Sequence, residues 1–383
     1  MAPSRKVSPW IALSSAALAL PAFSAAPPDQ IQFGLKTTAY RESDQDSGTV
    51  LAGSDQRYDI SVNQFYLITP VGRNWSFAVD LSHESMSGAS PWGTLAAVGA
   101  DSQLVMSGAT IEEARNELSL GATRYFERSS FAVSLTRSKE NDYEADALAV
   151  NAEWDFNDKL STLALGLSYS SDELEPTDAL MFGRVSSETK QSRSLSLGWT
   201  QVLSRSSVLQ SGFSITDHRG YLSDPYKLRD IRPDQRLETA INVRYRHFIE
   251  PVNSSLHLDY RFYRDDFGIR SHTLRGAWYQ NLTSQFQLIP SMRYYSQNQA
   301  DFYVAGDNYG LADTVFQSSD YRLSGFGALT FGLQGRFSRR DWSVSVNFER
   351  YLSSASYGLD ASASEHPGLL QFNLLSLGFD IKL

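Results

Sequence analysis

The chain ends in Leu375-Ser376-Leu377-Gly378-Phe379-Asp380-Ile381-Lys382-Leu383, where apolar and polar residues alternate one by one. Because successive side chains of a β-strand point to opposite faces, this stretch predicts a strand with one apolar and one polar face. The same alternation recurs upstream, for example at 75–82 and 342–349. A period of two that returns along the whole chain predicts an all-β protein.

Alternating segments occupy most of the chain, and we count sixteen of them. They lie at 30–42, 56–69, 75–84, 113–126, 131–138, 145–156, 160–170, 190–203, 208–217, 236–248, 255–265, 270–280, 285–297, 320–337, 342–351 and 370–383. The second segment leaves its register open, because Phe65 to Ile68 is apolar on both faces.

Short and long connections alternate between these segments. The short ones are 70–74, 127–130, 157–159, 204–207, 249–253, 281–284 and 338–341, and the long ones are 43–55, 85–112, 171–189, 218–235, 298–319 and 352–369. Tight turns gathered at one end are typical of outer-membrane barrels. The sequence therefore predicts a transmembrane antiparallel up-and-down β-barrel of about 16 strands, with short periplasmic turns and long extracellular loops.

Composition excludes several other classes. The 383 residues include 34 basic and 43 acidic ones, a net charge of −9, and no cysteine, and the mean hydropathy is −0.32. The absence of cysteine excludes a disulfide scaffold, a thiolate metal site and cysteine catalysis. An acidic chain without a basic block argues against nucleic-acid binding. Beyond the N-terminal segment, no run reaches the roughly 18 apolar residues of a membrane helix.

The first 26 residues are typical of an export signal. Arg5 and Lys6 precede an apolar run from Trp10 to Leu20, and small residues follow Pro21. The alternative is a buried helix of the fold. We expect residues 1–26 to be a signal peptide and residues 27–383 to form one barrel domain in the bacterial outer membrane.

Aromatic residues cluster beside the predicted short turns. Five of the seven tryptophans stand there, namely Trp75, Trp154, Trp199, Trp278 and Trp342. Since aromatic rings favour the membrane–water interface, they predict an aromatic girdle at the periplasmic rim. The alternative is a set of ordinary core aromatics.

Inward positions of the predicted barrel segregate by charge. A basic wall is expected from Arg261, Arg275, Arg293 and Arg322, and an acidic wall from Asp80, Glu84, Glu117, Glu153 and Asp155. Distant strands face each other across a lumen, so the two walls predict a transverse field. Alternatively, each arginine simply pairs with a neighbour such as Asp259, Asp265 or Glu349.

Signals for other chemistry are few. The loop 85–112 is unusually apolar and is expected to fold inward and narrow the pore. His247, His257 and Asp259 lie around one tight turn, but no catalytic motif accompanies them, so we expect no enzyme. Asp224, Asp265 and Asp266 could bind a divalent cation, although solvated carboxylates are the more common case. No cofactor or metal is expected.

Several stretches together resemble an uncharacterised outer-membrane protein family of Gram-negative bacteria, catalogued as a domain of unknown function. They are Ser87 to Pro91, Gly220 to Lys227, Arg232 to Arg236, Tyr260 to Gly268, Arg293 to Tyr295 and Ser319 to Leu323. The resemblance implies a porin-like outer-membrane barrel and no established substrate. The C-terminal pattern Ser376-x-Gly378-x-x-Ile381-x-Leu383 also resembles the assembly signal of such barrels, with Leu in place of the usual Phe or Trp.

Two functions remain open at this point. A lumen enclosed by sixteen strands is wide enough for water, which predicts a porin-like channel for small hydrophilic solutes. The alternative is an occluded barrel that serves as a surface enzyme or displays its loops to a partner. The expected partners are outer-membrane lipid and lipopolysaccharide, the barrel assembly machinery through the last strand, and small hydrophilic solutes.

Overall fold

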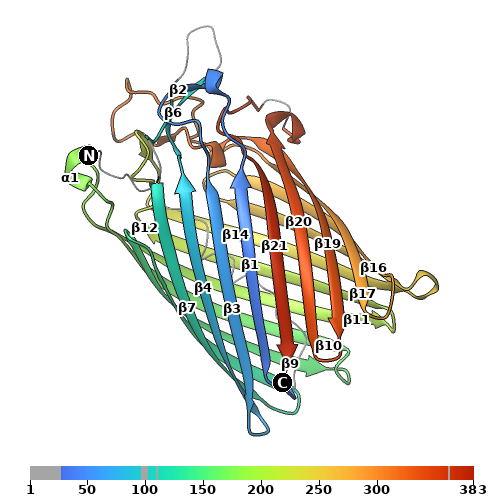
Figure 1. Ribbon diagram of the computed structural model, residues 1–383. Helices are drawn as coiled ribbons and strands as arrows, with labels where there is room; N and C mark the ends of the chain where they lie inside the picture. The colour runs from blue at the N-terminus through green and yellow to red at the C-terminus, as the bar shows by residue number, and fades with distance from the viewer. Residues whose placement is uncertain (1–26, 96–101, 109–110, 361–362) are drawn as a thin grey trace.

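Sixteen antiparallel strands close into one barrel, which confirms the strand number expected from the alternation (Figure 1). The computed structural model describes residues 27–95, 102–108, 111–360 and 363–383. The predicted signal peptide, residues 1–26, lies outside these ranges. Barrel strands that follow each other along the chain are paired, and β1 pairs with β21 to close the ring. Closure gives every barrel strand two partners and leaves no open sheet edge.

The barrel strands are listed here in chain order: β1 (Gln32–Glu42), β3 (Asp59–Val71), β4 (Trp75–Gly88), β7 (Ile111–Tyr125), β8 (Ser129–Lys139), β9 (Tyr143–Phe156), β10 (Ser161–Leu174), β11 (Glu188–Ser204), β12 (Ser207–Gly220), β14 (Gln235–Ile249), β15 (Ser254–Asp265), β16 (Arg270–Asn281), β17 (Phe286–Gln297), β19 (Phe326–Arg339), β20 (Trp342–Ser354) and β21 (Gln371–Lys382).

Seven short connections gather at one end of the barrel, which we call the short-turn end. They are 72–74, 126–128, 157–160, 205–206, 250–253, 282–285 and 340–341. The chain's C-terminus lies at this end, and the longer loops gather at the other, the long-loop end (Figure 1). Two connections at the long-loop end, 140–142 and 266–269, are nevertheless short.

The two faces of the barrel differ as the alternation predicts. Outward side chains are apolar and exposed, for example Leu81, Leu135, Leu167 and Leu377, which are 46–58 % exposed. The register left open in the second segment is settled by Tyr66, whose hydroxyl reaches over β1 along the inner wall and donates to Asp380 at 2.9 Å. Since Tyr66 points inward, its neighbours Phe65 and Leu67 point outward.

Smaller elements form the long-loop end. Five short strands lie there: β2 (Val50–Ala52), β5 (Pro91–Leu95), β6 (Gln103–Met106), β13 (Asp230–Ile231) and β18 (Gln317–Ser318). Strands β2, β6 and β5 form one small sheet, and β13 and β18 form another. The one α-helix of the described residues, α1, spans Ala179–Phe182. No helix in the described ranges has the length and apolarity needed to cross a membrane.

Candidate functional site

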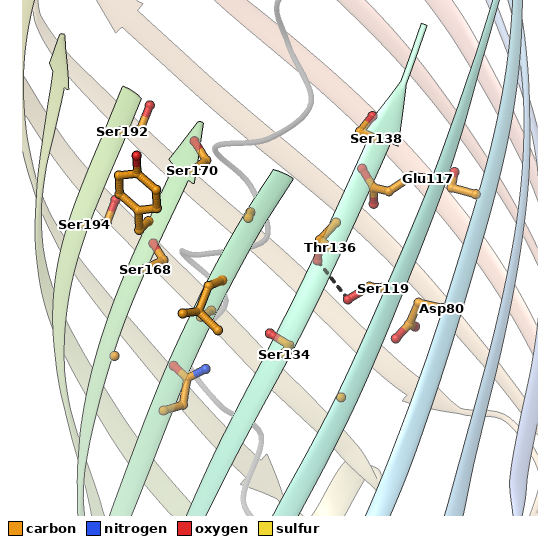
Figure 2. A pocket seen from close by; sticks show the side chains of 18 of the residues that line it. Asp80, Glu117, Ser119, Ser134, Thr136, Ser138, Ser168, Ser170, Ser192 and Ser194 are labelled. Atoms are coloured by element: carbon orange, nitrogen blue, oxygen red, sulfur yellow. Dashed lines mark hydrogen bonds between the residues drawn. The ribbon is translucent and has the colours of Figure 1, made fainter. Parts of the chain in front are cut away.

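The barrel encloses a cavity of about 1070 Å³ (Figure 2). Most of its lining comes from inward side chains of β4 and β7 to β12, many of them small and hydroxyl-bearing, and β1, β3, β14, β20 and β21 contribute the rest of the strand residues. Hydroxyl residues among them include Ser119, Ser134, Thr136, Ser138, Ser168, Ser170, Ser192, Ser194, Ser214 and Thr216. The cavity exists because these positions carry serine, threonine, alanine and glycine, which leave the middle of the barrel unfilled.

Neighbouring hydroxyl groups of the cavity wall form hydrogen bonds with one another. Thr136 donates to Ser119 at 2.9 Å, and Ser194 and Thr216 share a hydrogen bond of 2.8 Å. Each hydroxyl also has capacity for a further partner. These hydroxyls can therefore exchange hydrogen bonds with water or a polar solute without adding charge to the wall.

The five carboxylates of the predicted acidic wall stand on inward positions of β4, β7 and β9. Asp80, Glu117 and Glu153 line the cavity. Arg115 partly neutralises this wall, because its guanidinium lies 2.5 Å from Glu84 and 3.5 Å from Glu117. Asp155 accepts a hydrogen bond from Thr162 at 2.8 Å.

Three arginines of the predicted basic wall also point inward, on three adjacent strands. The ladder places Arg275 opposite Arg293 on one side and opposite Asp259 on the other. Asp259 lies 3.6 Å from Arg275 and 2.6 Å from Arg246, so Arg246 is its closer partner. Arg261 and Arg293 form no ion pair with any carboxylate among the residues that the structure describes.

Tyrosine rings lie beside two of these arginines. The Arg261 guanidinium is 5.4 Å from the ring centre of Tyr263, and that of Arg293 is 5.9 Å from the ring centre of Tyr295. A tyrosine face attracts a cation but leaves its positive charge uncompensated. The simple alternative, that every wall arginine is neutralised by a carboxylate, does not hold for these two.

The two walls face each other across the barrel. In the closed strand order, β7 of the acidic wall lies eight strands from β16 of the basic wall in either direction. Strands half a ring apart lie at opposite ends of a diameter. The residues of the two predicted walls thus stand on opposite sides of the ring, and a transverse field between them stays a prediction.

The placement of Arg322 on a barrel strand was wrong. Residues Tyr321–Leu323 form a 3₁₀ turn, and β19 begins only at Phe326. The Asp320 carboxylate accepts the Arg322 backbone N–H at 3.0 Å and also pairs with its guanidinium, which fixes the turn. Arg322 therefore borders the cavity from a loop.

Loops from several parts of the chain pack together over this end of the lumen. We call the described parts of 43–58, 89–110, 221–234, 298–325 and 355–370 the loop layer. Arg232 joins two of these loops, at 2.8 Å from Asp230 and 2.9 Å from Asp320. Arg322 extends the network to Asp224 at 3.1 Å. These cations hold the pKa of the fully buried Asp320 well below its ordinary value, although burial opposes this.

The loop between β4 and β7 crosses the mouth of the barrel. It spans 89–110, shorter than the predicted 85–112, and residues 96–101 and 109–110 lie outside the described ranges. Its Trp92 carbonyl accepts the Leu228 N–H at 2.6 Å, and its Thr94 carbonyl accepts the Asp307 N–H at 2.6 Å. Both partners belong to loops of strands about six places away around the ring.

Loop side chains border the cavity at the long-loop end. Leu222, Asp224, Arg232 and Arg322 contribute from the loop layer. At the other end the cavity reaches Tyr125 and Ser130, which flank a short turn, as do many of the barrel's aromatic residues. The loop layer therefore covers a lumen that extends along most of the barrel.

His366 joins three loops of this layer. Its Nε2 lies 3.0 Å from the Ser319 carbonyl and 3.3 Å from the Thr94 hydroxyl, and its Nδ1 accepts the Gly368 N–H at 2.9 Å. An accepting Nδ1 places the proton on Nε2, so the ring is neutral. Burial, together with Lys227 nearby, lowers the pKa of His366 from 6.5 to about 4.

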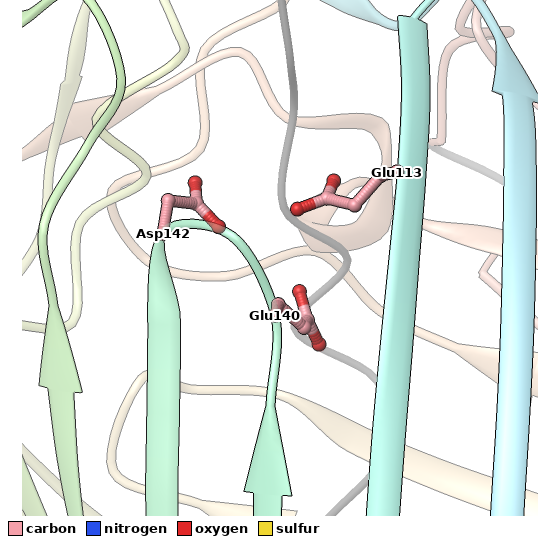
Figure 3. Close-up of side chains that lie close together, drawn as sticks. All are labelled: Glu113, Glu140 and Asp142. Atoms are coloured by element: carbon pink, nitrogen blue, oxygen red, sulfur yellow. The ribbon is translucent and has the colours of Figure 1, made fainter.

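A group of buried carboxylates lies at the top of β7 and in the β8–β9 turn (Figure 3). One ligand atom from each of Glu113, Glu140 and Asp142 lies within 4.8 Å of the others, and all three residues are buried. Burial raises the pKa of Asp142, which also accepts a hydrogen bond from the Tyr226 hydroxyl. Such an all-oxygen donor set suits a hard cation such as Ca²⁺.

This group was not predicted, because Glu113 is distant in sequence from the other two and only the barrel register brings them together. The carboxylates singled out for divalent ions have other partners instead. Asp265 lies 2.6 Å from Arg236, Asp224 pairs with Arg322, and Asp266 accepts the Leu237 N–H at 2.9 Å.

The histidines around the β14–β15 turn do not come together. The ladder pairs Arg246 with His257 and His247 with Leu256, so His257 points inward and His247 outward. His257 stacks on Tyr279 with ring centres 3.9 Å apart. The structure thus separates the one group that suggested nucleophilic catalysis.

All five predicted girdle tryptophans lie on outward positions near the short-turn end. Trp75, Trp154 and Trp199 are about two-fifths exposed, and Trp278 and Trp342 are partly buried by neighbouring side chains. Phe337 packs against Trp342 with ring centres 5.6 Å apart. Their placement fits a girdle at one rim, which stays a prediction.

Comparisons with known proteins agree with this architecture. A family model described as a protein of unknown function (DUF3570) matches residues 11–375. No curated protein sequence matches the chain. A solved structure described as a bacterial polysaccharide outer membrane secretin is similar with a TM-score of 0.52 and 9 % identity, over 92 % of this chain and 98 % of that one.

A second similar structure is CdiB from Acinetobacter baumannii. Its TM-score is 0.52 at 9 % identity, over 93 % of this chain and 60 % of CdiB. At such low identity these likenesses concern the fold alone. They identify the molecule as a closed barrel of the kind found among outer-membrane proteins.

Proposed function

The chain belongs to the DUF3570 family of proteins of unknown function, and from its geometry we propose that it is an outer-membrane channel for small hydrophilic solutes. The observation that carries the proposal is the cavity of about 1070 Å³, lined by hydroxyls and charges, inside a barrel with an apolar exterior. An exposed apolar surface around a polar interior suits a bilayer outside and water inside.

The bacterial outer membrane is the membrane that this exterior fits. Antiparallel barrels with short turns at one end and long loops at the other are the form of outer-membrane proteins. The likeness to an outer-membrane secretin supports this location. With the short turns in the periplasm, the tryptophans near those turns would lie at the periplasmic interface.

The loop layer makes this a channel whose outer mouth is closed at rest. Hydrogen bonds and ion pairs hold loops from distant strands across the mouth. Passage then requires part of the layer to move. Loops have fewer packing contacts with the barrel than strands have with one another, so they are the part of the fold most able to open.

Swelling of liposomes in solutions of neutral sugars tests the proposal. Vesicles with refolded residues 27–383 should swell slowly, and those with a variant in which a short Gly-Ser linker replaces residues 89–110 should swell faster. A folded variant that admits no sugar faster than empty vesicles would reject the channel. Heat-modifiable migration on gels verifies that both barrels are folded.

A second candidate function is favoured by the same loop layer. A barrel that stays closed could present its loops to a partner at the cell surface. Swelling separates the two functions, because a permanently closed barrel stays impermeable under every condition that leaves it folded. We propose no catalytic activity, since His247 and His257 lie on opposite faces of the wall.

A further inference from the structure

Two arginines face each other on the outer surface of the barrel at the long-loop end. Strands β15 and β16 meet at the turn 266–269, and their ladder places Arg264 directly opposite Arg270. Both residues are exposed. They share the outward face with Tyr260 and Leu274, which are 40 % and 52 % exposed.

Like charges directly opposite each other in a ladder repel and destabilise the pairing. Among the ion pairs formed by the described residues, none involves Arg264 or Arg270. Two positive charges therefore stand together at this rim without a compensating carboxylate.

The same rim on β8 and β9 is arranged differently. There the ladder places Arg137 opposite Asp146 and Lys139 opposite Glu144. Arg137 lies 3.2 Å from Asp146 and 2.6 Å from Glu144, and Lys139 also pairs with Glu144. Carboxylates on a neighbouring strand thus neutralise the rim cations of β8 and β9, and no carboxylate does so for Arg264 and Arg270 among the described residues.

Neutral hydrogen-bonding groups flank the arginine pair. Thr239 lies opposite Arg264 on β14, and the Asn298 side chain accepts the Arg270 backbone N–H at 2.6 Å. The nearest outward carboxylate in sequence, Asp266, uses one oxygen to accept the Leu237 N–H at 2.9 Å. The guanidinium groups of Arg264 and Arg270 are therefore available to bind a ligand from outside the protein.

The position of Arg264 and Arg270 along the barrel indicates which ligand they bind. Below the arginines on the same face lie Phe262 and His272, and below these lie Tyr260 and Leu274. At a strand rise of about 3.3 Å per residue, the arginines lie about 7 Å along the strands from the first pair and about 13 Å from the second. Nine residues of β16 run from Arg270 to the outward Trp278 near the short-turn end. A tilted strand needs about 9–11 residues to cross the hydrocarbon core, so the arginines lie at the headgroup level of the opposite leaflet.

We propose that Arg264 and Arg270 together bind a phosphate group of a phosphorylated glycolipid in the outer leaflet. Phosphate carries close to two negative charges and accepts forked hydrogen bonds from guanidinium groups. The phosphate would neutralise both arginines, while the acyl chains of the same lipid would cover the apolar residues below them. The inference rests on the outer-membrane location proposed above and not on the barrel conducting solutes.

Native mass spectrometry of refolded residues 27–383 in detergent tests the site, with bis-phosphorylated lipid A as the probe. The wild type should retain the lipid, and R264Q/R270Q should require about tenfold more lipid for the same occupancy. The matched control R137Q/K139Q, which removes two rim cations that are already neutralised, should retain the lipid like the wild type. Dephosphorylated lipid A should bind the wild type no better than it binds R264Q/R270Q.

Equal lipid retention by R264Q/R270Q and the wild type would overturn the site. Equal retention of phosphorylated and dephosphorylated lipid A by the wild type would overturn the role of phosphate, and loss of the lipid to millimolar inorganic phosphate would overturn the role of the lipid chains. The single variants R264Q and R270Q, each with a smaller loss, provide the test if the double variant does not fold. Sugar permeation by R264Q/R270Q should be unchanged, so a failed channel and a failed lipid site give different results.

Discussion

Single residues decide how the barrel closes between its first and last strands. Gly34 of β1 lies beneath the Tyr66 ring, and a Cβ at this position would stand 2.1 Å from a ring carbon. The Tyr66 hydroxyl reaches over β1 to Asp380 of β21. The glycine therefore makes room for a tyrosine that connects three strands across the closure.

Replacing Gly34 with alanine should destabilise the folded barrel. The ring cannot move away without weakening its hydrogen bond to Asp380, and such overpacking typically costs about 1–3 kcal/mol. The expected result is a lower urea midpoint for unfolding in detergent. Gly121→Ala is the matched control, because its Cβ would meet Ala78 at an ordinary 3.5 Å. Equal midpoints for the two variants would contradict this role of Gly34.

At the scale of elements, the loop layer is held by a few buried polar contacts. Asp320 has no exposed surface and pairs with both Arg232 and Arg322. Removing one partner of a buried ion pair leaves a charge poorly compensated in a place that water does not reach. The layer should therefore respond to changes at single charged residues that leave the strands intact.

Arg322→Gln should loosen the loop layer, by less than the roughly 3–5 kcal/mol of a buried charge left without a partner, because Arg232 still pairs with Asp320. Proteinase K should then cleave the loops of the folded variant faster than those of the wild type. Arg219→Gln is the control, because Arg219 and Asp217 form an exposed pair at 2.8 Å whose loss should change little. Equal cleavage rates for the two variants would show that the ion pairs around Asp320 do not hold the loops together.

Acid should loosen the same layer through His366. Above pH 6.5 the ring is neutral whether the loops are closed or open. Between pH 6.5 and about 4, His366 binds a proton when the loops are open but stays neutral when they are closed. The stability of the closed layer therefore falls as the pH falls through this range. Proteinase K cleavage of the wild type should therefore rise from pH 7.5 to pH 5.

His366→Gln is the variant for this prediction. A glutamine amide can still donate to the Ser319 carbonyl but does not titrate, so the rise in cleavage at pH 5 should shrink. Asp320 and Lys227 face the ring from neighbouring loops, but the pKa of Asp320 is far too low for it to titrate in this range. An undiminished acid response in the variant would assign the effect to another group.

The strands could be predicted from the sequence because their signal is local. Alternation with a period of two shows all sixteen strands and the outward face of each except β3, where Phe65 to Ile68 is apolar on both faces. The strand prediction for Arg322 is wrong because Asp320 to Leu323 also alternates between polar and apolar residues, while the capping of the turn by the Asp320 side chain leaves no periodic pattern in the sequence. The contacts of the loop layer join residues far apart in the chain, such as Thr94 and His366, and a single sequence does not reveal them.

At the scale of the whole molecule, strand order converts a charge pattern along the chain into one across the lumen. The inward positions of the acidic wall on β4 to β9 could be predicted from parity alone. These carboxylates lie opposite Arg275 because β7 and β16 are eight strands apart in the closed ring of sixteen. Ion pairs such as Arg115 with Glu84 could not be predicted, because they depend on side-chain reach between neighbouring strands.

Neutralising the basic wall should shift ion selectivity. In R261Q/R275Q/R293Q the acidic wall remains, so the lumen should favour cations more strongly than in the wild type. The reversal potential in a KCl gradient should move toward the potassium equilibrium potential, with a smaller shift at high ionic strength. An unchanged reversal potential would remove these arginines from the path of the ions.

Single-channel conductance of refolded residues 27–383 in a planar bilayer tests the central claim most directly. The wild type should show rare openings of uniform size at pH 7.5, and R322Q and the variant shortened across 89–110 should show openings of longer duration. A correctly folded barrel that stays silent in all three forms would contradict the channel and favour a closed barrel that displays its loops.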